Sequence, residues 1–172
     1  MKISTRRLAV SALLLALDVL FVRVLALNTP VMKTGLGFAA IAFCAMAYGP
    51  CWAALVSALG DLLGSVLFPT GAYFPGFTLT AALTGLIFGL VLYKRPAGLA
   101  RAALAAALNC VLVSYLANSA LIAFISGAAY TALLATRAVQ LAVMLPVQCA
   151  VIYLLGRAKP VRDILDKISE NP

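Results

Sequence analysis

Residues 68–85 read FPTGAYFPGFTLTAALTG, and this stretch decides how the rest of the chain can fold. It lies between two long apolar runs and is interrupted early by Pro69, Gly71, Pro75 and Gly76. Proline removes a backbone donor and glycine permits backbone angles that other residues avoid, so the helix before this stretch cannot continue through it. The stretch also carries the aromatic residues Tyr73, Phe74 and Phe77, which a simple turn does not need. We therefore expect a shaped, aromatic connection between two helices.

The composition on either side of this connection is that of an integral membrane protein. The chain has 172 residues, of which 65% are hydrophobic and only 10% charged, and its mean hydropathy is +1.09. These values lie far outside the range of water-soluble domains. Because a membrane-spanning helix takes about 20 residues, six of them would use most of the chain. We expect one membrane domain over residues 1–172 and no soluble domain.

The apolar runs predict an all-α bundle of six transmembrane helices. The predicted spans are residues 8–27, 36–48, 51–67, 77–93, 99–125 and 130–155, followed by a polar tail over residues 157–172. The basic start of the chain is compatible with a signal peptide, but the first run is long and no A-x-A cleavage pattern closes it. We expect that run to stay as a helix.

The basic residues set the expected orientation. Most of the 13 lysines and arginines fall on one side of a six-span topology. They are Lys2, Arg6, Arg7, Lys94, Arg95, Arg101, Arg157, Lys159, Arg162 and Lys167. By the positive-inside rule we expect a multi-pass membrane protein with both termini in the cytoplasm. The net charge of +8 therefore reflects topology, and we expect no nucleic-acid partner.

Charged side chains inside the predicted spans are candidates for function, because charge is costly within a bilayer. Arg23, Asp61 and Arg137 lie a few residues from the outer ends of their helices, roughly 6 to 11 Å deep at about 1.5 Å per residue. Asn118 falls near the same depth. We expect these groups to meet in one layer that is open to the outside. Asp18 lies about 140° round the first helix from Arg23, so we expect it to face a neighbouring helix instead.

An alternative is that these polar groups only bond the helices to one another. Ser57, Asp61 and Ser65 recur every four residues, as do Ser114 and Asn118, and Arg137, Gln140 and Gln148 approximate such a stripe. A structural role is favoured for Ser57, Ser65, Ser114 and Gln148. For Arg23 and Asp61 the corresponding alternative is an ion pair with no part in ligand binding.

The side chains of this layer suit a flat, anionic ligand. Two guanidinium groups can dock carboxylates with paired hydrogen bonds, and Asp61 can accept from a ligand edge that presents N–H donors. Phe38, Tyr73 and Phe74 supply flat faces on which a ring can stack. The residues alone therefore indicate an aromatic anion.

Several enzyme classes find no support in the sequence. The chain has no histidine, its only glutamate is Glu170, and its four cysteines have no C-x-x-C spacing, so we expect no catalytic site, metal or cofactor. No G-x-x-x-x-G-K-[ST] loop is present either. If this protein supports uphill uptake, another subunit must supply the ATPase.

Several motifs resemble those of the folate-specific substrate-binding (S) components of energy-coupling-factor (ECF) vitamin transporters. The most specific is FPTGAYFPGFTLTA at residues 68–81, and RVLALNTPVMKTGLGF at residues 23–38, the Gly49-Pro50 pair and RAVQLAVMLPVQ at residues 137–148 follow the same order. The resemblance implies capture of folate or a reduced folate from outside, with a separate coupling membrane protein and two ATPases as partners.

The resemblance also implies roles for individual residues. The ligand layer would contain Arg23, Tyr73, Phe74, Asn118 and Arg137, in a protein of a bacterial cell membrane. To these the chemistry of the side chains adds Phe38 and Asp61, and Gln140 follows Arg137 on the polar stripe of the sixth helix. Two loops would act as gates, with Asn28, Pro30 and Lys33 in the first and Phe68, Pro69, Gly71, Pro75 and Gly76 in the second. An alanine motif on the first helix, Ala9, Ala12 and Ala16, would contact the coupling protein. Asn28 and Gln140 depart from the longer amide and the lysine expected in relatives, so recognition of the ligand's tail carboxylates is expected to differ.

Two other functions stay open at this point. One is an S component for another vitamin, thiamine or riboflavin, although two buried arginines suit a dicarboxylate tail better than a cationic ring. The other is a small membrane protein with an assembly role, in which the charges are internal ion pairs. Neighbouring genes or co-purifying proteins that include a coupling subunit and paired ATPases would favour an S component, for folate or for another vitamin, over the assembly role.

Overall fold

The computed structural model describes residues 5–24, 27–28, 33–69, 73–94, 98–127, 129–158 and 161. Its helices are α1 (Thr5–Val19), η1 (Leu20–Val24), α2 (Gly37–Tyr48), α3 (Pro50–Leu67), α4 (Pro75–Leu92), α5 (Leu99–Leu108), η2 (Asn109–Ala117), α6 (Asn118–Ser126) and α7 (Tyr130–Arg157). β1 (Leu27–Asn28) and β2 (Lys33–Thr34) form a two-residue antiparallel pair. Because α1 runs into η1, and α5 runs through η2 into α6, the described residues form six helical rods. The predicted all-α fold is confirmed.

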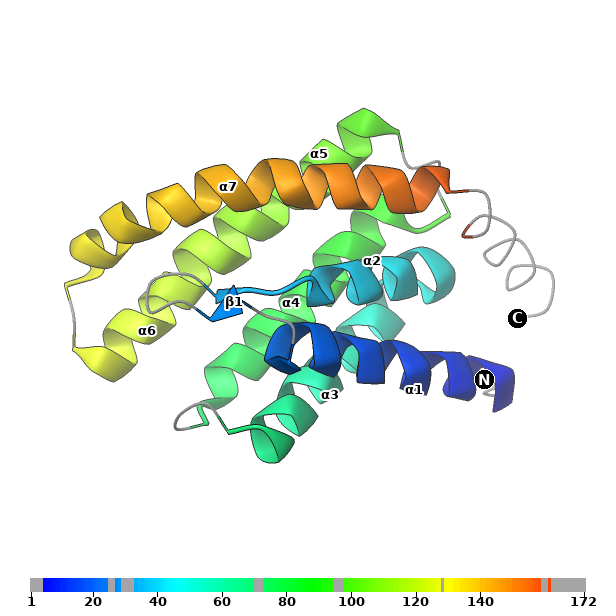
Figure 1. Ribbon diagram of the computed structural model, residues 1–172, viewed down its shortest axis with the longest axis horizontal. Coiled ribbons are helices and arrows are strands. Elements are labelled where there is room, and N and C mark those ends of the chain that lie inside the picture. Colours follow the sequence, from blue (N-terminus) through cyan, green and yellow to red (C-terminus); the bar gives the residue numbers. More distant parts are fainter. Residues whose placement is uncertain are drawn as a thin grey trace.

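The rods run back and forth across the bundle (Figure 1). β1, the start of α4, the end of α6 and the start of α7 lie at one end, on the left of the view; we call it the hairpin end. The start of α1, the end of α2 and the end of α7 lie at the opposite end, which we call the terminal end. The basic helix ends at Arg7 and Arg157 thus share one end, as the predicted topology requires.

Four of the helical rods are long and apolar enough to cross a membrane. They are Pro50–Leu67, Pro75–Leu92, Leu99–Ser126 and Tyr130–Arg157, and Gly37–Tyr48 is a shorter apolar helix. Large apolar side chains such as Leu13, Val66, Leu90 and Phe124 are exposed on the outside of the bundle. Such a surface is stable in hydrocarbon and costly in water. The chain is a multi-pass membrane protein.

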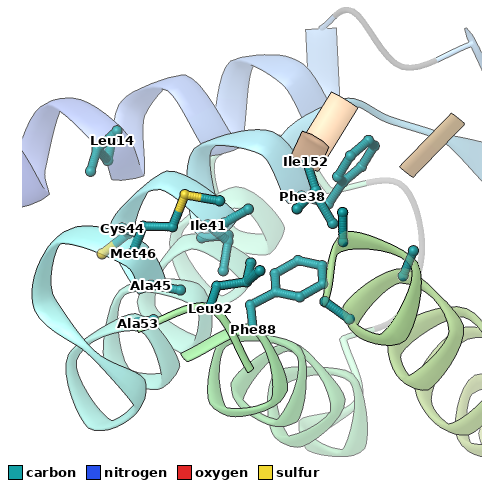
Figure 2. Close-up of a cluster of buried hydrophobic side chains, with 14 of the residues drawn as sticks. Leu14, Phe38, Ile41, Cys44, Ala45, Met46, Ala53, Phe88, Leu92 and Ile152 are labelled. Carbon is teal, nitrogen blue, oxygen red and sulfur yellow. The ribbon is translucent and has the colours of Figure 1, made fainter. Parts of the chain in front are cut away.

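The core lies where α2 packs between its neighbours. Ile41 and Cys44 on α2 are almost fully buried, as are Phe88 on α4 and Ile152 on α7. Figure 2 shows these side chains directed into one cluster, with Phe38 beside Ile152. Alanines fill the remaining contacts with α3 and α5, at Ala53, Ala102, Ala105 and Ala106. Small residues at these positions let the helices approach closely, which is how membrane helices gain packing energy without a strong hydrophobic effect.

The first helix is anchored at the terminal end by Arg7. Its guanidinium carbon lies 4.5 Å from the centroid of Trp52 and 5.0 Å from that of Tyr48. The indole nitrogen of Trp52 donates to Ser11 Oγ at 2.6 Å. Arg7 and Ser11 are one turn apart, so these contacts fix which face of α1 meets the corner between α2 and α3. That corner turns at Gly49, whose φ of 89° is one that side-chain-bearing residues rarely adopt.

Helices α3 and α4 make the most extensive contact in the bundle, and two glycines of α4 let them approach closely. A Cβ built on Gly85 would lie 2.4 Å from Ala53 O, and one built on Gly89 would lie 2.2 Å from Pro50 Cα. Gly85 and Gly89 form a G-x-x-x-G pair, the spacing that puts two glycines on one helix face. This contact holds Asp61 of α3 beside the first turn of α4.

The second predicted gate is shorter than expected, because α4 begins at Pro75. The prediction that Pro75 and Gly76 belong to the connection is wrong; both lie in the first turn of α4. Proline suits that position, since its fixed φ is helical and the amide hydrogen it lacks would have no partner there. Phe68 and Pro69 lie outside the helices and are exposed, and Gly71 falls outside the described residues.

Two π-helical segments were not foreseen. η1 contains Arg23, and η2 spans nine residues in the middle of the fifth rod. A π-helix bonds residues five apart and is found mainly at functional sites. Its wider turn, about 4.4 residues, rotates the backbone position of Arg23 by roughly 70° from where an α-helix would put it.

Candidate ligand-binding site

At the hairpin end a chain of hydrogen bonds joins α3, the end of the α3–α4 connection and α4. Thr78 on the first turns of α4 donates to Asp61 Oδ2 at 2.8 Å. The Tyr73 hydroxyl lies 2.9 Å from Thr78 Oγ1. Asp61 is partly buried, whereas Tyr73 is 47% exposed. The structure thus brings two of the predicted ligand residues together through a third, Thr78, that the sequence did not single out.

Aromatic rings surround the start of α4. The ring of Phe74 meets that of Phe77 edge-on, with centroids 6.4 Å apart, and lies 6.2 Å from Phe124 on α6. A Cβ on Gly76 would lie 2.6 Å from the Phe74 ring and 2.7 Å from Leu121. Position 76 therefore requires a glycine, because the Phe74 ring and Leu121 occupy the space that a Cβ would need. The connection ends in an ordered aromatic group packed against α6, as its composition predicted.

The other polar candidates lie on the fifth and sixth rods. Asn118 Oδ1 accepts from Thr80 Oγ1 at 2.8 Å, which ties the start of α6 to α4. Arg137 on α7 donates from Nη1 to the backbone carbonyl of Ser114 at 3.3 Å. Ser114 lies near the end of η2, where the five-residue bonding pattern stops. The π-helix thus presents a backbone acceptor to Arg137 only one turn from Asn118.

A second polar network lies deeper between the same rods. Asn109 Oδ1 accepts from Thr84 Oγ1 at 2.9 Å, and Asn109 Nδ2 donates to Gln148 Oε1 at 3.0 Å. Asn109 and Gln148 are both buried. The structural interpretation favoured for Gln148 is therefore confirmed. Asn109 was missed, although an asparagine within an apolar run is itself a signal of a hydrogen bond between membrane helices.

The remaining predicted site residues are placed as follows. Phe38 is buried at 8% exposure in the core cluster beside Ile152 (Figure 2). Gln140 is partly buried on α7, one turn after Arg137. The backbone of Arg23 lies in η1, that of Asn28 in β1 and that of Lys33 in β2; their side chains, and Pro30 as a whole, lie outside what the structure describes. Whether Arg23 pairs with Asp61 thus stays a prediction.

The first helix presents two different faces. Ser11, Leu14 and Asp18 are buried against the bundle. Ala9, Ala12 and Ala16 are all exposed; we call them the alanine face. Because the anchor at Arg7 and Ser11 fixes the rotation of α1, the alanine face is held on the outside of the domain, where a partner helix can reach it.

Asp18 packs between three helices, as predicted. It is 7% exposed, and its two carboxylate oxygens lie against Gly37 of α2 and Gly60 of α3. A Cβ on Gly37 would lie 2.4 Å from Asp18 Oδ1, and one on Gly60 would lie 2.5 Å from Oδ2. The two glycines therefore make room for the carboxylate at the junction of α1, α2 and α3.

We expect Gly60→Ala to lower the free energy of unfolding by about 1–3 kcal/mol, because the new methyl group displaces the Asp18 carboxylate. Thermal unfolding in detergent, followed for Gly60→Ala alone and in an Asp18→Ala background, measures this. The penalty should shrink when the carboxylate is absent. An equal penalty in both backgrounds would mean that Asp18 is not what the methyl group meets.

Comparison with known proteins places this arrangement in a family. The model of the ECF-type riboflavin transporter S component matches residues 2–157. A folate transporter FolT of Clostridium novyi is 35% identical over 92% of this chain and 92% of its own length. A second FolT, from Leuconostoc mesenteroides, is 29% identical over 97% of this chain and 93% of its own.

A solved structure agrees with the sequence matches. The crystal structure of FolT bound with folic acid superposes with a TM-score of 0.84 at 32% identity, covering 89% of this chain and 93% of that one. The match therefore covers most of this chain and nearly all of the FolT chain. The chain belongs to the S-component family of ECF-type transporters, and the curated relatives it matches within that family are folate transporters.

Proposed function

We propose that this protein binds folate or a reduced folate as the substrate-binding component of an ECF-type importer. The observation that carries the proposal is the 35% identity to a FolT over 92% of both chains. The likeness to a FolT structure that contains folic acid supports it. The chemistry of the site agrees, since arginine side chains, a carboxylate and aromatic rings suit a flat heterocycle with a carboxylate tail.

In this proposal each group has a task. Arg23 and Arg137 dock the tail carboxylates, and Asn118 and Gln140 contribute hydrogen bonds. Asp61 accepts from the N–H edge of the heterocycle, and Tyr73, Phe74 and Phe38 border the ring. The connections that contain Asn28, Pro30 and Lys33, and Phe68, Pro69 and Gly71, open and close the site from outside the cell membrane, with both termini in the cytoplasm.

Titration of the purified protein in detergent against a panel of vitamins tests the proposal. We expect saturable binding of folate or a reduced folate, and no binding of thiamine at the same concentrations. Riboflavin belongs in the panel because the matching family model carries its name. Tighter binding of riboflavin than of any folate would replace the proposed substrate, and no binding of any vitamin would remove the proposed function.

The same proposal makes the alanine face the contact for a coupling membrane protein that works with two ATPases. We expect Ala12→Leu to weaken assembly with that protein by about tenfold, since a larger side chain keeps a partner helix from approaching closely. Co-purification of the tagged S component with its coupling module measures this. Folate binding by the isolated variant should be unchanged, and Leu13→Phe, on an already bulky exposed position, is the matched control. Assembly of Ala12→Leu at the wild-type level would contradict this role of the alanine face.

A further inference from the structure

Thr78 lies between Asp61 and Tyr73, two of the residues predicted for the ligand layer. Its hydroxyl is 2.8 Å from Asp61 Oδ2 on one side and 2.9 Å from the Tyr73 hydroxyl on the other. Thr78 is partly buried on the first turn of α4, while Tyr73 is 47% exposed.

The number of available protons fixes the direction of these two hydrogen bonds. A carboxylate has no proton to donate, so the single proton of the Thr78 hydroxyl is used in the bond to Asp61. The Thr78 oxygen can then only accept from Tyr73, and the phenol must donate its own proton inward. The hydrogen bonds therefore run from Tyr73 through Thr78 to Asp61.

This direction decides what Tyr73 offers to a ligand. With its proton committed to Thr78, the phenol oxygen has only lone pairs to present outward. Hydrogen bonds in a chain polarise one another, and the negative charge at Asp61 makes the Tyr73 oxygen a stronger acceptor than an isolated phenol. If Thr78 lost its hydroxyl, the phenol would be free to rotate and to point its proton at the ligand.

We propose that Thr78 is a positioning residue that fixes the Tyr73 hydroxyl as a hydrogen-bond acceptor for an N–H group at the edge of the ligand's heterocycle. This inference rests on the proposed function, because it concerns the same site and a ligand that presents N–H donors. It adds a determinant of specificity: the site holds two acceptors of fixed direction, Asp61 and Tyr73, and selects against rings whose edge carries acceptors.

The test compares variants that differ by one atom or one methyl group. Thr78→Val keeps the shape and removes the hydroxyl, and we expect folate affinity to fall about tenfold, as for one lost buried hydrogen bond. Thr78→Ser keeps the hydroxyl and should bind folate within about twofold of the wild type. Thr136→Val is the matched control, since the Thr136 hydroxyl is exposed and bonds only carbonyls of its own helix.

A double-mutant cycle and an altered ligand separate positioning from a general structural role. Tyr73→Phe should lower the folate affinity about as much as Thr78→Val does. The double variant should lose no more affinity than either single variant, because both substitutions remove the same interaction. A folate analogue with methyl in place of the ring amino group lacks the amino N–H donors, which this test assigns to Tyr73, and keeps the lactam N–H of the ring. Its affinity should not fall in Thr78→Val, so the preference for folate should shrink about tenfold.

The possible outcomes lead to different conclusions. If wild-type protein binds folate but Thr78→Val binds it equally well, or if both ligands lose affinity equally, Thr78 does not position Tyr73. If wild-type protein binds no folate, the proposed function fails, and amide hydrogen exchange of the ligand-free protein still tests the chain of hydrogen bonds. Exchange near Tyr73 should then be faster in Thr78→Val than in Thr78→Ser, and equal exchange would overturn the inference.

Discussion

Replacing Arg137 by alanine should weaken folate binding by at least about 2 kcal/mol, or roughly thirtyfold, the cost of a lost charge-assisted contact. Arg137 is partly buried on α7, and its Nη1 donates to the Ser114 carbonyl at 3.3 Å. That bond uses one of the five N–H donors of the guanidinium and orients the group toward the rod that also carries Asn118. A guanidinium held in this way is suited to a bidentate contact with a carboxylate.

Three comparisons make the Arg137 experiment specific. Arg137→Lys keeps the charge and loses the paired geometry, so its affinity should fall between the wild type and Arg137→Ala. Arg157→Ala removes an exposed arginine at the other end of α7, where the side chain stacks on Tyr153, and should leave binding unchanged. The affinity for pteroate, which lacks the glutamate tail, should fall much less in Arg137→Ala than the affinity for folate. Wild-type affinity in Arg137→Ala, measured by equilibrium titration, would remove the assigned role.

The number and order of the helices followed from the sequence because long apolar runs and their breaks are local properties. Gly49 and Pro50 ended one helix and began the next where predicted, and Pro75 began α4 because proline fits the first helical turn better than a loop interior. The π-helices could not be read from the same pattern. They change the hydrogen-bond spacing within an unbroken apolar run, and hydropathy does not record that change.

The polar site was predictable only in part for a related reason. Charged residues within a span stand out by their cost, so Asp61 and Arg137 were identified from the sequence. Threonines do not stand out, since a membrane helix tolerates them by bonding their hydroxyls to its own backbone. Thr78, Thr80 and Thr84 each bond a side chain on another segment in this fold, and only the helix packing shows which segment that is. Phe38, predicted to border the ligand, also packs in the core cluster, which its place in the sequence did not show, and its role in binding stays a proposal.

The second large effect is expected at the contact between α3 and α4. Ordinary van der Waals contact of a Cβ begins at 3.4 Å, whereas a Cβ at Gly89 would lie 2.2 Å from Pro50 Cα. The atom it would meet is backbone, so no side-chain rotation relieves the overlap, and the helices would have to separate by about 1 Å. Gly89→Val adds two further methyl groups at the same place. We expect it to cost about 3 kcal/mol or more of unfolding free energy.

A loss of that size should lower the thermal unfolding midpoint of the detergent-solubilised protein by about 10 °C. Labelling of the buried thiols of Cys44 and Cys110 follows the transition directly, because both become reactive only when the core opens. Gly98→Ala is the matched control, since nothing lies within 4 Å of the Cβ it would add. Folate affinity should fall as well, because separating α3 from α4 lengthens the 2.8 Å bond between Thr78 and Asp61. If Gly89→Val unfolds at the wild-type temperature, the close approach of these helices is not what holds the two sides of the site together.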